Sequence, residues 1–197
     1  LSPDILRPLL ACKDLGSFTL QLYPGFDADD DFLAEIATAW PNIHTLKLFD
    51  IHVDQEPTVT LACLIPFARH CPDLSTLGIR MFCSEVPTFS HTTGDRFDHY
   101  LDVLEVGTSP ITEDLQDVSK IAAFLSNLFP HLSEISSSES DEENSARWDR
   151  VVEMVPVFAS VRVQEKNFWT EELSAEQDSD DETGEESSTQ RDAEEDA

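Results

Sequence analysis

The chain repeats one pattern of apolar and polar positions through its first two thirds. An apolar residue is followed by a second one three positions later and by a third one two positions after that. The copies are Leu15/Phe18/Leu20, Ile43/Leu46/Leu48, Leu74/Leu77/Ile79 and Leu101/Leu104/Val106, with a degraded fifth copy at Leu132/Ile135/Ser137. Their first residues are 28, 31, 27 and 31 positions apart. The alternating end of each copy predicts a short strand with one buried face.

The segments between the copies predict helices. Residues 29–40 place apolar side chains on one face after an acidic start, and Pro41 ends the helix. Residues 58–71 form a second stripe, in which Pro66 kinks the helix or lies in its first turn. The segment 111–130 is the clearest helix, with Thr112 as the expected N-cap and with Leu115 on the apolar stripe.

A last helix is expected from about residue 145, because Trp148, Val151, Val152 and Val155 recur at helical spacing. Between Phe82 and Tyr100 no such spacing exists, so the third unit predicts an irregular loop. Strand-and-helix units of this length are typical of leucine-rich repeats, whose stacked copies share one core. The sequence therefore predicts an α/β leucine-rich-repeat solenoid with parallel strands on the concave face and helices outside.

The acidic residues define the domain boundaries. We predict a repeat domain over 1–169, with an exposed acidic loop at 136–145, and a disordered acidic tail over 170–197. From Glu171 onward the chain has 13 acidic residues and Leu173 as the one large apolar residue, too few to offset the entropy of ordering. Ser140, Ser179 and Thr183 precede a carboxylate by three positions, which fits either phosphorylation by acid-directed kinases or a merely solvated tail.

The formal net charge of -28 argues against nucleic acid or anionic lipid as a partner. No apolar run is long enough for a membrane span, and LSPDILRPLL has neither an initiator Met nor a signal-peptide pattern, so we expect part of a longer chain. The four Cys residues lack zinc-site spacing and predict reduced thiols in or near the core. The expected location is therefore the cytoplasm or the nucleus.

The sequence offers little catalytic chemistry. No glycine-rich phosphate-binding loop is present. Asp50, His52 and Asp54 form the best metal-like cluster, but a polar loop after the second strand explains them equally. His70 and Cys71 are adjacent, and adjacent side chains rarely meet as a nucleophile and its base. We predict no enzymatic activity, no cofactor and no metal.

The remaining candidate is a surface. The strand positions between the buried residues should face the concave side, where solenoids commonly bind partners. Those positions are Thr19 and Gln21, Lys47 and Phe49, Gly78 and Arg80, Glu105 and Gly107. Lys47, Phe49, Arg80 and Glu105 are the candidate partner-binding residues, since basic and aromatic side chains on neighbouring strands favour interfaces. The alternative is that Lys47 and Arg80 neutralise nearby carboxylates and Phe49 packs under the rim.

The repeats resemble the C-terminal leucine-rich-repeat half of F-box proteins that are abundant in mushroom-forming fungi. The resemblance covers roughly residues 4–165 and is carried by LRPLLACKDLGSFTL, AWPNIHTLKL, TLACLIPFARHCPDLSTLGI, LDVLEVGTSPI, VSKIAAFLSNLFPHLSEI and WDRVV. It implies a ubiquitin-ligase adaptor, in which an F-box docks to the ligase core and the repeats hold a protein substrate. No F-box is present in these 197 residues, and the Asn that usually follows the strands is missing. A repeat scaffold without a ligase connection is the alternative.

Overall fold

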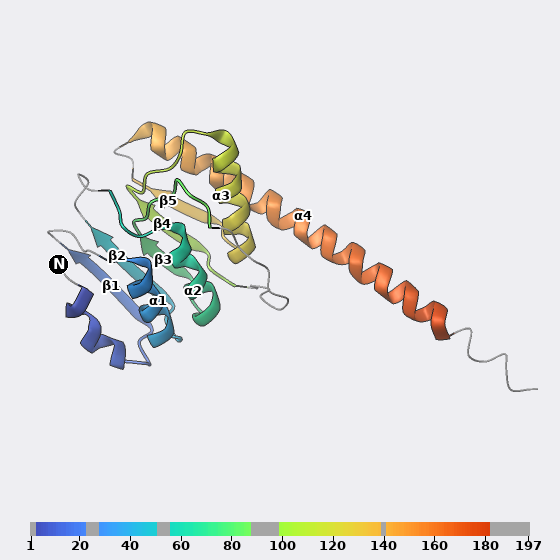
Figure 1. Ribbon diagram of the computed structural model, residues 1–197, viewed down its shortest axis with the longest axis horizontal. Helices are drawn as coiled ribbons and strands as arrows, with labels where there is room; N and C mark the ends of the chain where they lie inside the picture. The colour runs from blue at the N-terminus through green and yellow to red at the C-terminus, as the bar shows by residue number, and fades with distance from the viewer. Residues whose placement is uncertain (1–2, 23–27, 51–55, 88–98, 139–140, 182–197) are drawn as a thin grey trace, which may run out of the picture. The chain divides into compact units, whose positions relative to one another are not determined.

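The computed structural model describes residues 3–22, 28–50, 56–87, 99–138 and 141–181, and contains one sheet of five parallel strands. The strands follow the order of the sequence across the sheet (Figure 1): β1 Ser17–Leu22, β2 Thr45–Asp50, β3 Thr76–Ile79, β4 Val103–Gly107 and β5 Glu134–Ser137. The predicted α/β class is therefore correct, and each copy of the repeated pattern, the degraded fifth included, forms one strand.

The register of the sheet follows the repeat. The middle apolar residue of each copy pairs with its counterpart on the next strand, in the row Phe18, Leu46, Leu77, Leu104 and Ile135. The backbone ahead of each strand repeats as well: one carbonyl accepts two N–H groups from the following unit. The acceptors and their donor pairs are Gly16 with His44 and Thr45, His44 with Ser75 and Thr76, Ser75 with Asp102 and Val103, and Asp102 with Ser133 and Glu134.

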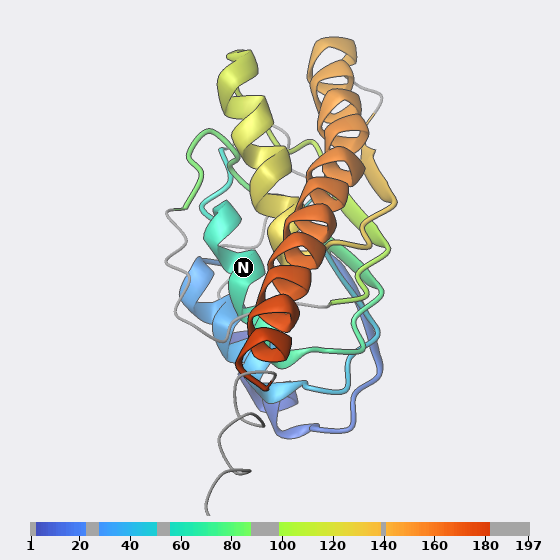
Figure 2. The same cartoon turned by 90° about the vertical axis from the view of Figure 1, so that its right-hand side faces the viewer.

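The helices α1, α2 and α3 lie on the same face of the sheet (Figure 2). α1 spans Asp30–Ala39, and the Asp29 side chain caps it by accepting from the Phe32 N–H at 2.8 Å. α2 spans Leu64–His70 after the 3-10 turn η3 Leu61–Cys63, so Pro66 lies in its first turn. Ahead of β1, the 3-10 turns η1 Pro3–Ile5 and η2 Arg7–Ala11 are present, and η2 packs against α1.

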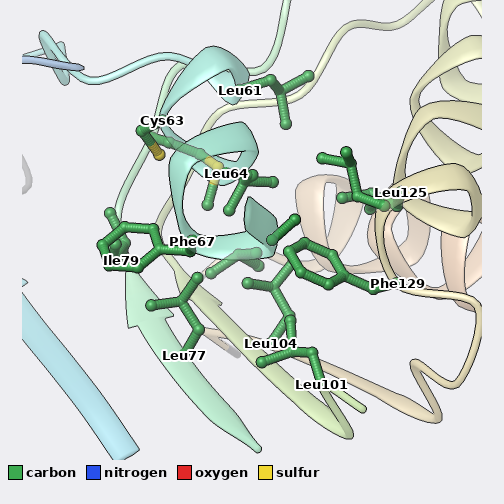
Figure 3. Close-up of a cluster of buried hydrophobic side chains, with 14 of the residues drawn as sticks. Leu61, Cys63, Leu64, Phe67, Leu77, Ile79, Leu101, Leu104, Leu125 and Phe129 are labelled. Carbon is green, nitrogen blue, oxygen red and sulfur yellow. The ribbon is translucent and has the colours of Figure 1, made fainter. Parts of the chain in front are cut away.

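The core lies between the sheet and these helices. Figure 3 shows its centre, where Leu64 and Phe67 of α2 meet Leu77 of β3 and Leu104 of β4. All four side chains are fully buried. Because neighbouring units share this cluster, no single strand and helix needs a core of its own. Cys63, Cys71 and Cys83 are buried in it, whereas Cys12 is exposed, contrary to the expectation for all four thiols.

α3 spans Leu115–Leu128 and corrects two details of the prediction. Leu115 is 57% exposed, because it lies at the first position of the helix, before the stripe turns toward the sheet. The N-cap is Asp114, whose side chain accepts from the Gln116 N–H at 2.8 Å. The Thr112 hydroxyl instead accepts from the Asp114 N–H at 3.2 Å, so it orders the turn ahead of the helix.

In the third unit, the His99 side chain takes the role that the C-terminus of a helix has in other units. In other units the backbone carbonyl of Cys71 or Phe129, at the C-cap of α2 or α3, accepts the N–H three residues later. Here the His99 Nδ1 accepts the Leu101 N–H at 3.0 Å, and Nε2 lies 2.6 Å from the Cys71 carbonyl oxygen. Residues 83–87 contain no helix, and most of the predicted loop lies outside the described residues.

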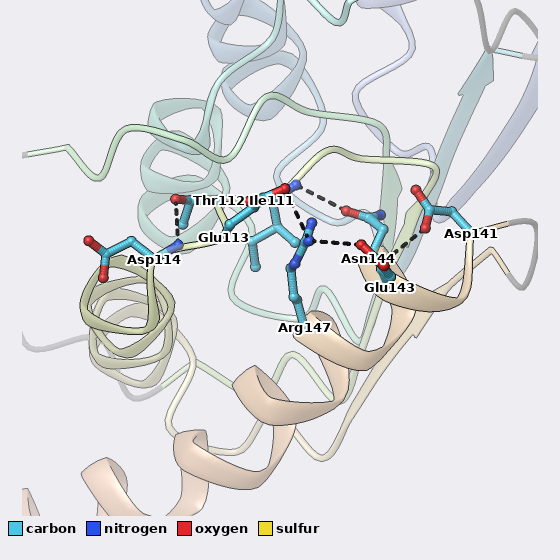
Figure 4. Close-up of polar contacts among 8 residues, drawn as sticks. All are labelled: Ile111, Thr112, Glu113, Asp114, Asp141, Glu143, Asn144 and Arg147. Carbon is cyan, nitrogen blue, oxygen red and sulfur yellow. Dashed lines mark hydrogen bonds and ion pairs between the residues drawn. The ribbon is translucent and has the colours of Figure 1, made fainter.

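The last helix, α4, spans Glu142–Asp181. Its first part belongs to a compact unit, Leu1–Ala159, and Trp148, Val151 and Val155 are buried there. The buried Asn144 side chain fixes its start. The amide oxygen accepts from the Ile111 N–H at 3.2 Å (Figure 4), and the amide nitrogen donates to the Ser109 carbonyl at 2.9 Å. The second unit is Ser160–Ala197, so the division precedes the predicted boundary after residue 169.

The acidic segments differ from the prediction. Ser136 and Ser137 belong to β5 and the helix begins at Glu142, so the predicted loop at 136–145 is shorter than expected. Helix α4 includes residues 170–181, while 182–197 lie outside the described residues, so the disorder of the tail stays a prediction.

Candidate protein-binding surface

The face of the sheet opposite α1, α2 and α3 is the candidate binding surface. We call it the open face and define it by eight residues, two on each of the units one to four: Thr19, Gln21, Lys47, Phe49, Gly78, Arg80, Glu105 and Gly107. Seven of them are half-buried or exposed and alternate with the buried residues of the strands, whereas Gly78 is itself buried. Thr19, Lys47, Gly78 and Glu105 stand in one row across four strands.

An ion pair crosses this row. The Lys47 Nζ of β2 lies 2.5 Å from the Glu105 Oε1 of β4, and the two side chains are 27% and 25% exposed. The strand between them presents Gly78, so no side chain stands between the two charges. The alternative interpretation is therefore correct for Lys47, whose charge is balanced within the chain. The pair is nevertheless held at the surface, three-quarters shielded from water, which weakens solvent screening between the two charges.

Gly78 is the reason for this geometry. A Cβ atom built on Gly78 would lie 2.8 Å from the Phe49 Cζ, and 3.2 and 3.3 Å from Lys47 Cγ and Cβ. The Phe49 ring and the Lys47 stem therefore both lie against bare backbone on β3. Phe49 is half-buried.

Arg80 follows directly after β3, two positions beyond Gly78 on the same side of the chain. Its side chain is half-buried. Three of the four candidate residues therefore lie around Gly78. They are Lys47, Phe49 and Glu105. The structure places Arg80 beyond the end of that strand.

Sequence reasoning named these four residues but missed the role of Gly78. It identified Lys47 and Phe49 as a pair on one strand and Glu105 as a separate position. The missing information was available in the repeat: Lys47, Gly78 and Glu105 each follow the second apolar residue of their copy by one position. Equivalent positions lie in register, so a Gly between a Lys and a Glu predicts an ion pair across the middle strand.

Gly107, the last residue of β4, has a special backbone conformation. Its φ is +55°, in the left-handed region, and the register between β4 and β5 shifts at this point. Glycine is the residue that enters this region without a steric penalty. β4 ends at this bulge, and the Ser138 N–H after β5 still donates to the Gly107 carbonyl at 2.8 Å.

Other candidate chemistry is not brought together by the described residues. The Cys71 thiol is buried, donates to the Ala37 carbonyl at 3.3 Å, and its pKa is raised to about 12 by burial. It is therefore a neutral thiol at physiological pH, not an activated nucleophile with His70, which is exposed. His52 and Asp54 lie outside the described residues, so the metal-like cluster with Asp50 does too. Over the part of the chain that is described, no three His, Cys, Asp or Glu side chains form a possible metal site.

None of the helices described here has the length and apolar content required to cross a membrane. Comparison of the sequence with models of known protein families and with functionally characterised proteins gives no match. The open face and its geometry are therefore the observations on which a function can be proposed.

Proposed function

We propose that this chain is a leucine-rich-repeat domain that binds another protein through its open face. The repeated strand positions, the sequential parallel sheet and the shared core support the leucine-rich-repeat assignment. The observation that carries the binding role is the group formed by Lys47, Glu105 and Phe49 around Gly78. Its side chains are fixed on strands rather than loops, so little side-chain entropy is lost when a partner binds.

The partner would meet a surface with both charge signs and one aromatic ring. Lys47 and Arg80 are basic, Glu105 is acidic, and the surrounding Thr19 and Gln21 are exposed and uncharged. In a chain with a formal net charge of -28, this is a locally balanced patch. It favours a protein with polar and aromatic groups over a nucleic acid or an anionic membrane.

We further propose that the bound protein is a substrate of a ubiquitin ligase, with this chain acting as its adaptor. The resemblance to fungal F-box proteins supports this step. The three buried Cys thiols are consistent with a reducing cytoplasmic or nuclear location. A scaffold without a ligase connection is the second candidate, since the open face alone fits both. Neither role requires catalysis, a cofactor or a metal.

A charge exchange tests the binding role. Lys47→Glu combined with Glu105→Lys keeps an ion pair across Gly78 but reverses it, so we expect normal folding and loss of partner capture. Arg80→Glu should also weaken capture. Lys120→Glu is the matched control for Arg80→Glu, because it makes the same charge change at a 62% exposed position on α3, away from the open face. If the charge-exchange and Arg80→Glu variants capture the same proteins as the unaltered chain and the Lys120→Glu control, the open face is not the binding surface.

The ligase connection needs its own measurement. Affinity purification of the full-length protein should recover ligase core subunits together with the captured protein. The captured protein should carry less ubiquitin in cells that express the charge-exchange variant. Recovery of the same captured protein without any ligase subunit would favour the scaffold instead.

A further inference from the structure

A row of exposed side chains lies at the turns that lead into the last three strands. Its members are Asp73, Tyr100 and His131, and each stands immediately before the first apolar residue of its copy of the repeat. We call these three residues the turn row. The residues three positions later are register partners on β3, β4 and β5. Because neighbouring parallel strands lie about 4.8 Å apart, the three turns should follow one another at a similar spacing.

Two members of the turn row form an aromatic stack. The ring centroids of Tyr100 and His131 are 4.8 Å apart, and the two ring planes differ by 5°. The stack therefore continues the repeat of the sheet in the turns ahead of it. Tyr100 remains 64% exposed although His131 covers one face of its ring. The second face of the ring is therefore open to solvent.

The backbone holds Tyr100 next to Asp73. The two residues that flank Tyr100 in the chain are buried, and one of them, His99, places its Nε2 2.6 Å from the Cys71 carbonyl oxygen. Two residues after Tyr100, a backbone N–H donates to the Ser75 carbonyl at 3.0 Å. These two contacts reach the preceding unit on either side of Asp73, so Asp73 and Tyr100 are neighbours in the turn row.

The turn row is also acidic. Asp73 and Asp102 are both exposed, and none of the ion pairs among the described residues includes either of them. The Arg or Lys residue nearest to Asp73 in the chain is Arg69, which lies in the last turn of α2 and has a contact of its own. An open tyrosine face beside such carboxylates attracts a cation, because the ring face and the carboxylates are both electronegative.

We propose that the turn row binds an arginine side chain of a protein partner. The guanidinium stacks on the open face of Tyr100 and forms an ion pair with Asp73. Arginine fits this arrangement better than lysine, because its planar guanidinium stacks on aromatic rings, is weakly hydrated and presents a fork of donors to a carboxylate. The formal net charge of -28 also favours the approach of a basic segment.

This surface goes beyond the proposed function and does not depend on it. The turn row shares no residue with the open face, and it identifies a partner by an exposed, arginine-containing segment. The ring needs little reorganisation to bind, since its backbone is held between two buried neighbours. Tyrosine and arginine are also two of the residue types that contribute most to protein interfaces.

The test is an NMR titration of the intact, isotope-labelled chain with two peptides at about 0.15 M salt. One peptide is Gly-Arg-Gly-Arg-Gly-Arg-Gly, and the other has Lys in place of every Arg. Both carry the same charge, so the general attraction to an acidic chain is the same for both. We expect the Arg peptide to shift the amide signals of residues 72–75 and 99–102 and to bind at least about twofold more tightly than the Lys peptide.

Substitutions in the turn row separate the ring from the charge. Tyr100→Leu keeps an apolar side chain but removes the aromatic face, and should weaken binding of the Arg peptide by about two- to fivefold, whereas Tyr100→Phe should retain most of it. Asp73→Asn should weaken binding about twofold. Asp149→Asn is the matched control, because it makes the same charge change at an exposed position of α4 and should leave binding at the turn row unchanged.

The replaced side chains are exposed, so urea unfolding of these variants should match that of the unaltered chain. The variant with exchanged charges at Lys47 and Glu105 should bind the Arg peptide normally, which separates this proposal from the one for the open face. Equal binding of the Arg and Lys peptides would overturn the proposal. So would unchanged binding in Tyr100→Leu, or amide shifts confined to residues outside the two turns.

Discussion

Because Gly78 has no side chain, the Phe49 ring and the Lys47 stem can lie against the backbone of β3. Replacing Gly78 is the most informative test of this packing. In a strand, Gly is less favourable than Ala by about 0.5–1 kcal/mol, so Gly78→Ala would stabilise the protein if space allowed. The structure does not provide that space. The new Cβ would lie 2.8 Å from the Phe49 Cζ, whereas ordinary contacts begin at 3.4 Å. The ring must therefore retreat by about 0.6 Å.

This displacement sets the expected magnitude. Moving the Phe49 ring and tightening the two Lys47 contacts costs about 1–3 kcal/mol, by analogy with overpacked cores. After subtraction of the gain from removing Gly, we expect Gly78→Ala to lower the free energy of unfolding by ~0.5–2 kcal/mol. In a Phe49→Ala background the shortest contact is absent, and the flexible Lys47 stem can move. There the same substitution should be neutral or stabilising by up to ~1 kcal/mol.

The assay is urea unfolding of the four proteins in this double-mutant cycle, with Gly16→Ala as the matched control. A Cβ on Gly16 would meet only the His44 Nδ1 at 3.6 Å, an ordinary contact, so that variant should not be destabilised. We expect a coupling free energy of about 1–2 kcal/mol between positions 78 and 49. Effects that add within ~0.5 kcal/mol would refute the explanation, because the two positions would then be independent.

Three further predictions concern the core and its polar contacts. Burial lowers the pKa of His99 below 6.5, against smaller opposing effects of its bond to the Cys71 carbonyl and of Asp73, so the folded state favours neutral His99. The stabilisation by neutral His99 should be fully present above about pH 6.5, and the free energy of unfolding should fall as the pH decreases toward the lowered pKa. Urea unfolding at a series of pH values measures this loss. The loss should be smaller in His99→Gln and unchanged in the control His131→Gln. Iodoacetamide at neutral pH should label Cys12 alone in the folded chain and all four Cys in denaturant, as counted by mass spectrometry; labelling of a buried thiol before unfolding would contradict the packing. Asn144→Asp keeps the shape but replaces the amide that donates to the Ser109 carbonyl with a carboxylate, so the melting temperature at neutral pH should fall by more than for Asp149→Asn at an exposed position of the same helix, corresponding to a loss of ~2–3 kcal/mol.

The positions of the strands could be predicted because the signal is local and repeated. Leu46, Leu77 and Leu104 recur at the spacing of alternating strand residues, and burial of all three follows from the period alone. The helix after β1 was equally readable, with an acidic start and a terminating Pro41. The N-cap of α3 was predicted wrongly: the cap is Asp114, and Asp is preferred over Thr at this position, so the sequence already favoured it over Thr112.

The contacts on the open face could not be predicted from a single repeat unit. That Lys47 and Glu105 form a pair depends on two strands that are 58 residues apart in the chain and on the space above Gly78 between them. Likewise, His99 replaces a helix end only because the Cys71 carbonyl of the preceding unit lies within reach of its ring. Neither contact is encoded in a local period.

By itself the sequence determined the repeat, the α/β class and the residues that face away from the core. Hydrophobic burial depends on which positions are apolar, and a period of two or 3.6 is visible in one dimension. The tertiary structure alone decided which of those outward side chains meet, because ion pairs and ring contacts require atoms within a few ångströms of each other.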